Sequence, residues 1–158
     1  MLTFALPLLA ACSKPAHDGH AHAPAPAATA HGHEHVAPHG GTAVVLGEEA
    51  YHLELVLDAP RGVLQAFVLD GHMENFIRCA APSFEVVATV GGEKRVLSFA
   101  AVADPATGEK VGDTALFEAR ADWLKTTPVF EAELSTLTIK GTTFARVPFR
   151  FPSGNDRD

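Results

Sequence analysis

The residues Tyr51-His52-Leu53-Glu54-Leu55-Val56-Leu57 decide the fold class of this chain. Apolar side chains recur here at every second position, from Tyr51 to Leu57. A period of two is that of a β-strand, whose successive side chains point to opposite faces. We therefore expect a half-buried strand that carries His52 and Glu54 together on its polar face.

Short apolar segments bounded by turn residues continue on both sides of this stretch. Further strands are expected over residues 43–46, 63–69, 84–90, 95–102, 115–121, 130–134, 136–140 and 144–151. Residues 115–121 also fit the start of a helix capped by Asp113, but we favour a strand followed by a helical turn around Trp123. Pro148 has no N–H to donate to a ladder, so it predicts an edge position or a bulge in the last strand.

About seven to nine short strands, with turns every 8 to 12 residues, are typical of an antiparallel sandwich or barrel. Gly91-Gly92 and Gly141 lie where two hairpin turns are expected. No segment is long enough for the helical crossovers of a parallel sheet. We predict an all-β fold, an antiparallel immunoglobulin-like β-sandwich over residues 39–152, with residues 153–158 disordered.

The segment before this domain has a different composition. Residues 13–38 consist largely of alanine, proline and histidine. The prolines oppose regular helix or sheet, and alanine cannot supply a core. We therefore predict a disordered tether over residues 12–38. Six of the nine histidines lie in it, at His17, His20, His22, His31, His33 and His35.

These tether histidines predict a metal-binding segment. Neutral imidazole is the commonest protein ligand for zinc, copper and nickel. The alternating spacing of His31-x-His33-x-His35 lets a flexible chain place several imidazoles round one ion. Such a site is adaptable and poorly selective, so copper(II) should bind more tightly than nickel or zinc. Copper(I) prefers sulfur, and Met73 is the only methionine besides the initiator. The alternative is a solvated spacer that binds nothing.

Three histidines of the domain are further candidate ligands. His39 lies in Pro38-His39-Gly40-Gly41, where the tether meets the first strand, and His72 follows the third expected strand. If the first three strands are neighbours, His39, His52 and His72 could meet beside Glu54 and bind zinc or copper(II). The alternative is that each is a surface histidine on a half-exposed sheet. Cys79 is expected to be a small core or loop residue.

The beginning of the chain resembles the leader of bacterial lipoproteins. Leu9-Ala10-Ala11-Cys12 follows an apolar run of signal-peptide size and matches a lipobox. The resemblance implies that residues 1–11 are a signal peptide and that Cys12 receives the N-terminal lipid. It also implies a place in the cell envelope, facing the periplasm, with Ser13 favouring the outer membrane over the inner. The alternative is a buried N-terminal segment with an incidental cysteine.

A second resemblance covers roughly residues 31–75. Pro38-His39-Gly40-Gly41, Tyr51-His52-Leu53-Glu54 and Leu69-Asp70-Gly71 are similar to the His-rich segment and first strands of periplasmic adaptor proteins of heavy-metal efflux systems. Some uncharacterised envelope lipoproteins are built in the same way. The resemblance implies metal handling in the periplasm, with metal-efflux components as possible partners.

The composition and the absence of catalytic motifs argue against two classes of function. Acidic residues outnumber basic ones by 19 to 12, which argues against nucleic acid as a partner. The chain contains no Gly-x-Ser-x-Gly, His-Glu-x-x-His or phosphate-binding glycine loop, so we expect no enzyme. We predict a lipid-anchored buffer, sensor or delivery partner for divalent transition metals. The alternatives are a protein-interaction module with a plain tether and, third, a metalloenzyme that uses the domain histidines.

Overall fold

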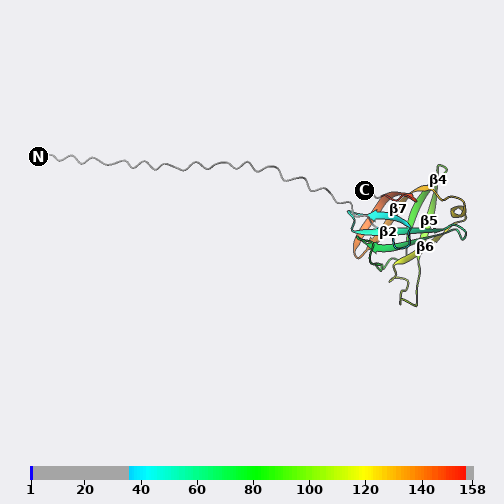
Figure 1. The fold of residues 1–158 in the computed structure, drawn as a ribbon, viewed down its shortest axis with the longest axis horizontal. Coiled ribbons are helices and arrows are strands. Elements are labelled where there is room, and N and C mark those ends of the chain that lie inside the picture. Colours follow the sequence, from blue (N-terminus) through cyan, green and yellow to red (C-terminus); the bar gives the residue numbers. More distant parts are fainter. Residues whose placement is uncertain (2–35, 156–158) are drawn as a thin grey trace. The chain divides into compact units, whose positions relative to one another are not determined.

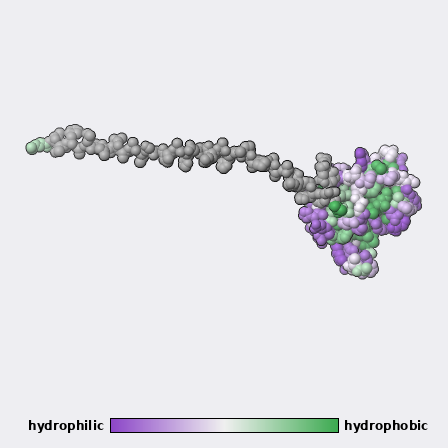
Figure 2. Space-filling model, viewed as in Figure 1, coloured by the Kyte–Doolittle hydropathy of each residue, from purple (hydrophilic) through white to green (hydrophobic). Residues whose placement is uncertain are grey.

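The computed structural model describes Met1 and residues 36–155 (Figure 1). The predicted signal peptide, Cys12 and the six tether histidines lie outside the described residues. Within the part that is described, no helix has the length and apolar character needed to cross a membrane. Figure 2 shows hydrophilic and apolar residues interspersed over the visible face of the domain.

The domain is built from antiparallel β-strands, as predicted from the alternation of apolar residues. Its described residues form eight strands: β1 Thr42–Leu46, β2 Tyr51–Asp58, β3 Val63–Asp70, β4 Ser83–Val90, β5 Glu93–Ala101, β6 Leu116–Arg120, β7 Phe130–Ile139 and β8 Thr142–Phe151. One short 3-10 helix, η1 Asp122–Lys125, follows β6. The helical turn expected around Trp123 and the strand before it are both confirmed.

The eight strands belong to one nearly closed sheet in the order β1-β2-β3-β6-β5-β4-β7-β8. The joint between β5 and β6 is short, with pairs only at Ala100↔Glu118 and Ala101↔Phe117. It divides the sheet into two halves of four strands, β1-β2-β3-β6 and β5-β4-β7-β8. The two halves enclose a common core, so the arrangement is sandwich-like (Figure 1).

Aromatic side chains from both halves meet in this core. Phe84 on β4 stacks on Phe99 of β5 with ring centroids 4.8 Å apart. Phe117, on β6 of the other half, approaches Phe84 edge-on at 5.1 Å. Leu124 of η1 is fully buried in the same cluster. Apolar burial across the two halves therefore holds the sandwich together.

Two tight hairpins confirm the turn predictions. Gly91 and Gly92 connect β4 to β5 with φ of 59° and 84°. Lys140 and Gly141 connect β7 to β8 with φ of 48° and 87°. Positive φ at both central residues is the geometry that matches the right-handed twist of paired strands.

Strand β7 differs from its prediction as two separate strands. Residues 130–134 and 136–140 were expected to be independent, whereas Phe130–Ile139 is continuous. Val86 pairs with Leu134 while the preceding Glu85 pairs with Thr136, so Ser135 is an additional residue in β7. Such a bulge interrupts the alternation without ending the strand. The neighbouring β8, which contains Pro148, lies at the edge of the sheet as predicted.

The ordered domain also extends past its predicted end at residue 152. Gly154 is buried and exchanges two backbone hydrogen bonds with Arg150, of 3.0 and 2.6 Å. The Asn155 side chain accepts from Val45 N at 2.7 Å and donates to Val45 O at 3.2 Å. Thr42 Oγ1 donates to Pro152 O at 2.8 Å. The residues after β8 therefore close the seam between β8 and β1.

Candidate functional site

His39 and Glu54 form a histidine–carboxylate pair on the outer face of β2. The Glu54 side chain is 0% exposed, whereas that of His39 is 40% exposed. His39 Nδ1 lies 2.8 Å from Glu54 Oε2. The other carboxylate oxygen, Oε1, accepts from the backbone N–H of His39 at 2.7 Å and of Gly41 at 2.9 Å. A buried carboxylate is thus fully hydrogen-bonded by the segment that joins the tether to β1.

The two glycines after His39 allow this close contact. Gly40 has a φ of 67°, and its N–H donates to Ala37 O at 2.9 Å in a turn. At Gly41 a Cβ atom would lie 2.6 Å from Leu55 O, so only glycine lets the backbone approach β2 this closely. Pro38-His39-Gly40-Gly41 is therefore a structural unit that folds onto β2.

Aromatic contacts fix the plane of the His39 ring. His39 stacks on Phe67 of β3 with ring centroids 4.0 Å apart and an interplanar angle of 19°. Phe76 lies 5.7 Å away from the His39 ring. Phe67 is also the cross-strand partner of Glu54. The ring is consequently held by a hydrogen bond on one edge and by an aromatic ring on one face.

This arrangement leaves one nitrogen of His39 available for chemistry. A carboxylate only accepts hydrogen bonds, so His39 Nδ1 carries the hydrogen of this contact. In the neutral ring the lone pair then lies on Nε2. A metal-ligating histidine typically donates its other N–H to a carboxylate or carbonyl in this way. The His39–Glu54 contact is one such histidine–carboxylate hydrogen bond.

His52 does not lie on an exposed polar face, and this prediction is corrected. The residue is 0% exposed, and its Nδ1 lies 3.2 Å from Asp70 O. β2 is paired on both sides, by β1 and β3. The tether junction packs over Glu54, and the loop after β3 approaches the β1–β2 turn, where a Cβ atom on Gly71 would clash with Glu49 O. His52 is therefore buried, although the alternation in β2 had predicted that it lies on a polar, half-exposed face.

His72 is exposed in the loop after β3. Asp70 organises this loop, because its carboxylate accepts from the Asn75 side chain at 2.6 Å and from the Glu74 N–H at 2.9 Å. These contacts, that of Asn75 above all, hold the pKa of Asp70 below its ordinary value. His72 itself is thereby placed at the surface of a tightly turned loop.

The three domain histidines do not form the predicted common site. β1, β2 and β3 are neighbours, as that prediction required. Among residues 36–155, however, no group of three or more His, Cys, Asp or Glu side chains is placed to hold a metal ion. His39 is bound to Glu54, His52 is buried and His72 is exposed. Glu54 forms a hydrogen bond with one histidine, His39, instead of lying beside all three.

Cys79 is a buried core residue, as expected. Its side chain is 1% exposed and belongs to the core cluster. Desolvation by burial raises the pKa of the Cys79 thiol to about 11. Burial therefore disfavours the thiolate, which is the reactive form of a cysteine.

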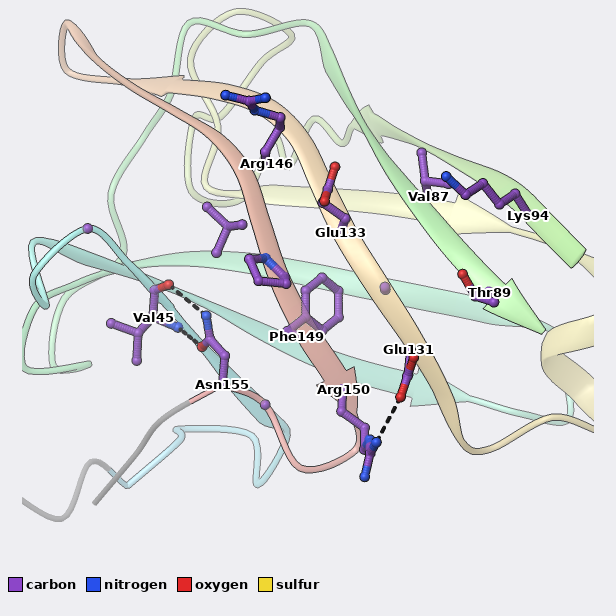
Figure 3. Close-up of a pocket in the computed structure, with 15 residues that line it drawn as sticks. Val45, Val87, Thr89, Lys94, Glu131, Glu133, Arg146, Phe149, Arg150 and Asn155 are labelled. Carbon is purple, nitrogen blue, oxygen red and sulfur yellow. Dashed lines mark hydrogen bonds and ion pairs between the residues drawn. The ribbon is translucent and has the colours of Figure 1, made fainter. Parts of the chain in front are cut away.

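A groove of about 880 Å³ crosses the outer face of β4, β7 and β8 (Figure 3). Basic side chains of Lys94, Arg146 and Arg150 line it together with Glu131 and Glu133. Arg150 Nη2 donates to Glu131 Oε1 at 2.8 Å, at one end of the groove. Glu131 and Glu133 of β7 thus lie in a groove that carries charges of both signs.

Comparison of the chain with protein-family models, with curated proteins and with solved structures finds no match. The resemblances to lipoprotein leaders and to efflux adaptors therefore remain predictions from sequence motifs.

Proposed function

We propose that this protein is a lipid-anchored envelope protein that binds divalent transition-metal ions, copper(II), zinc or nickel. Its tether histidines collect the ion, and His39 contributes a fixed ligand at the domain surface. The protein acts as a buffer, sensor or delivery partner for metal efflux. The observation that carries this proposal is the His39–Glu54 contact of 2.8 Å, which lies where the His-rich segment joins the domain.

The position of His39 in the chain supports a shared site. His35 precedes it by only four residues, a stretch that spans at most about 14 Å when extended. His33 precedes His39 by six residues. Several imidazoles can therefore reach an ion bound at His39. Two or more neutral imidazoles are the ligand set that zinc and copper(II) favour.

Metal titration of the full-length chain tests the proposal. A Cys12→Ser protein, which cannot be lipidated, is titrated with Zn²⁺ and Cu²⁺ by calorimetry. Replacing the six tether histidines by alanine should remove most of the binding capacity. His39→Ala alone should weaken the tightest site, and His72→Ala, an exposed histidine, is the matched control. Full capacity and affinity in the protein that lacks all seven histidines would overturn the proposal.

Lipid anchoring is tested separately. The lipobox motif predicts a chain that begins at Cys12 and carries a diacyl or triacyl mass in the membrane fraction. Mass spectrometry of that fraction measures this mass directly. A Cys12→Ser protein that still fractionates with the membrane would contradict the anchor and would leave the metal proposal untouched.

The groove on β4, β7 and β8 supports a second candidate function, a protein-interaction module. Its three basic and two acidic side chains offer ion-pair partners to another envelope component. In that case the tether is a plain spacer. Deleting its histidines should then leave the cellular phenotype intact, whereas substitutions in the groove should abolish it.

A further inference from the structure

We propose that Glu54 is a positioning residue that fixes the tautomer of His39, so that Nε2 is the nitrogen offered to a divalent metal ion. This inference rests on the proposed function, because it assigns the chemistry of the same site. It goes beyond that function by separating two roles: His39 contacts the ion, and Glu54 acts only through His39.

The hydrogen bonds of Glu54 specify one tautomer. Its carboxylate accepts from two backbone N–H groups and from the ring of His39, at 2.7, 2.9 and 2.8 Å. None of its atoms is exposed, so water does not replace these donors. An ionised carboxylate has no hydrogen to give, and the opposite tautomer would place two acceptors against each other. Nδ1–H is therefore the tautomer that this pocket stabilises.

The aromatic contact with Phe67 also limits how the His39 ring can turn. Stacking on Phe67 at 4.0 Å fixes the plane of the ring. Turning the ring over would present Nδ1 outward and would break the bond to Glu54 Oε2. The His39 side chain is 40% exposed, whereas that of Glu54, which holds Nδ1, is 0% exposed. The pair presents one preoriented imidazole nitrogen, with a buried negative charge behind it that strengthens the ligand.

This assignment also separates the domain ligand from the tether ligands. A histidine without a fixed hydrogen-bond partner for its ring can use either nitrogen, because nothing selects its tautomer. His39 can use only Nε2 while Glu54 holds Nδ1. Loss of an outer partner of this kind typically weakens metal affinity by about 10- to 100-fold.

The substitution Glu54→Gln tests the assignment because it exchanges one acceptor for a donor. The amide oxygen of glutamine can still accept from the N–H groups of His39 and Gly41. Its NH₂ group then faces Nδ1 and donates to it, which moves the ring hydrogen to Nε2 and removes the outward lone pair. Glu85→Gln on β4 is the control, because that glutamate is exposed on the other half of the sheet and lies outside the groove.

Two readouts on the full-length Cys12→Ser chain decide the outcome. Nitrogen-15 NMR at pH 8 without metal should show the hydrogen on Nδ1 of His39 in the unsubstituted chain and on Nε2 in Glu54→Gln. Zn²⁺ titration followed at the His39 signal should show at least a tenfold weaker site in Glu54→Gln and no change in Glu85→Gln. Glu54→Asp, which keeps a carboxylate, should retain the Nδ1–H tautomer.

The two proposals fail in distinguishable ways. An Nε2–H tautomer at His39 in the unsubstituted chain would overturn the inference. This measurement does not depend on whether any variant folds. A tautomer change without loss of Zn²⁺ affinity would overturn it as well. If the tautomers behave as expected but Zn²⁺ leaves the His39 signal unaffected, the proposed function fails at this residue, and the role assigned to Glu54 fails with it.

Discussion

The backbone at Gly41 lies against β2 without room for a side chain. A Cβ atom would meet Leu55 O at 2.6 Å and Val56 Cγ2 at 2.8 Å. Because a backbone oxygen of a paired strand cannot move aside, Gly41→Ala should lower the free energy of unfolding by about 2–3 kcal/mol. It should also pull the junction away from Glu54, which denaturant unfolding and the His39 NMR signal measure together.

Gly40→Ala is the control for this steric effect. Its Cβ atom would meet nothing within 4 Å, but its φ of 67° is unfavourable for a side chain. The expected loss is about 1 kcal/mol, with the His39–Glu54 bond kept. Equal losses in the two variants, or an unchanged His39 signal in Gly41→Ala, would show that the contact with β2 does not shape the junction.

The buried thiol of Cys79 gives a prediction about pH and reactivity. Its pKa is raised by burial to about 11, so below pH 9 the folded protein holds almost no thiolate. A Cys12→Ser protein should therefore react slowly with iodoacetamide at pH 8 and rapidly once denaturant unfolds it. Mass spectrometry follows the added mass. Stoichiometric alkylation of the native protein would contradict the burial of Cys79.

The sign of the accompanying stability effect follows from the same shift. The folded state binds the Cys79 proton more tightly than the unfolded state, whose thiol titrates near its ordinary value of about 8.5. The contribution of the neutral thiol to stability is present below that value. It is lost as the pH rises toward 11.

The burial and the partners of individual side chains could not be predicted from this sequence. The alternation in β2 correctly separated the two faces of the strand. It could not show that the segment before β1 and the loop after β3 pack against the outer face, because both segments lie outside the strand whose pattern was read. His52 and Glu54 were therefore expected to be exposed, and both are buried. The partnership of His39 with Glu54 spans 15 residues, and only the paired glycines after His39 hinted at a close contact.

At the scale of elements, Asn155 acts as a bridge between β8 and β1. Its side-chain amide both accepts from and donates to the backbone of Val45. Asn155→Ala should remove both hydrogen bonds and lower the free energy of unfolding by about 1–2 kcal/mol. Hydrogen exchange should become faster at the Val45 amide and stay unchanged in β4.

Asn75→Ala is the matched control for that bridge. Asn75 also donates from its side-chain amide, at 2.6 Å to Asp70, but in an exposed loop. Its loss should change stability by less than about 0.5 kcal/mol. Unchanged protection of Val45 in Asn155→Ala would mean that the seam is closed by other contacts.

Strand and turn positions could be predicted where a local sequence pattern determines them. The predictions were wrong where pairing with another strand determines the structure. The hairpins at Gly91-Gly92 and Lys140-Gly141 follow from residues that tolerate positive φ. The continuity of β7 could not be predicted, because the bulge at Ser135 exists only in its pairing with β4. The order of the eight strands depends on contacts distant in the sequence, which no local pattern encodes.

At the scale of the whole molecule, metal binding should depend steeply on pH. An imidazole must be neutral to ligate, and an unperturbed histidine has a pKa near 6.5. Binding that uses several tether histidines should weaken strongly as the pH falls from about 7.5 to about 5.5. Calorimetric titration across this range measures the effect. A site made of carboxylates would weaken much less, because these stay ionised to about pH 4.

The closed seam brings the two ends of the ordered domain together. Thr42 contacts Pro152, and Val45 contacts Asn155, so the chain enters and leaves the sheet at the same place. The sheet is therefore compatible with circular permutation. A chain that joins residue 155 to residue 36 through a short glycine linker, and opens between Gly91 and Gly92, should reach the same fold. Its new ends would lie at the β4–β5 turn, and thermal unfolding would show whether the permuted sheet keeps its cooperative transition.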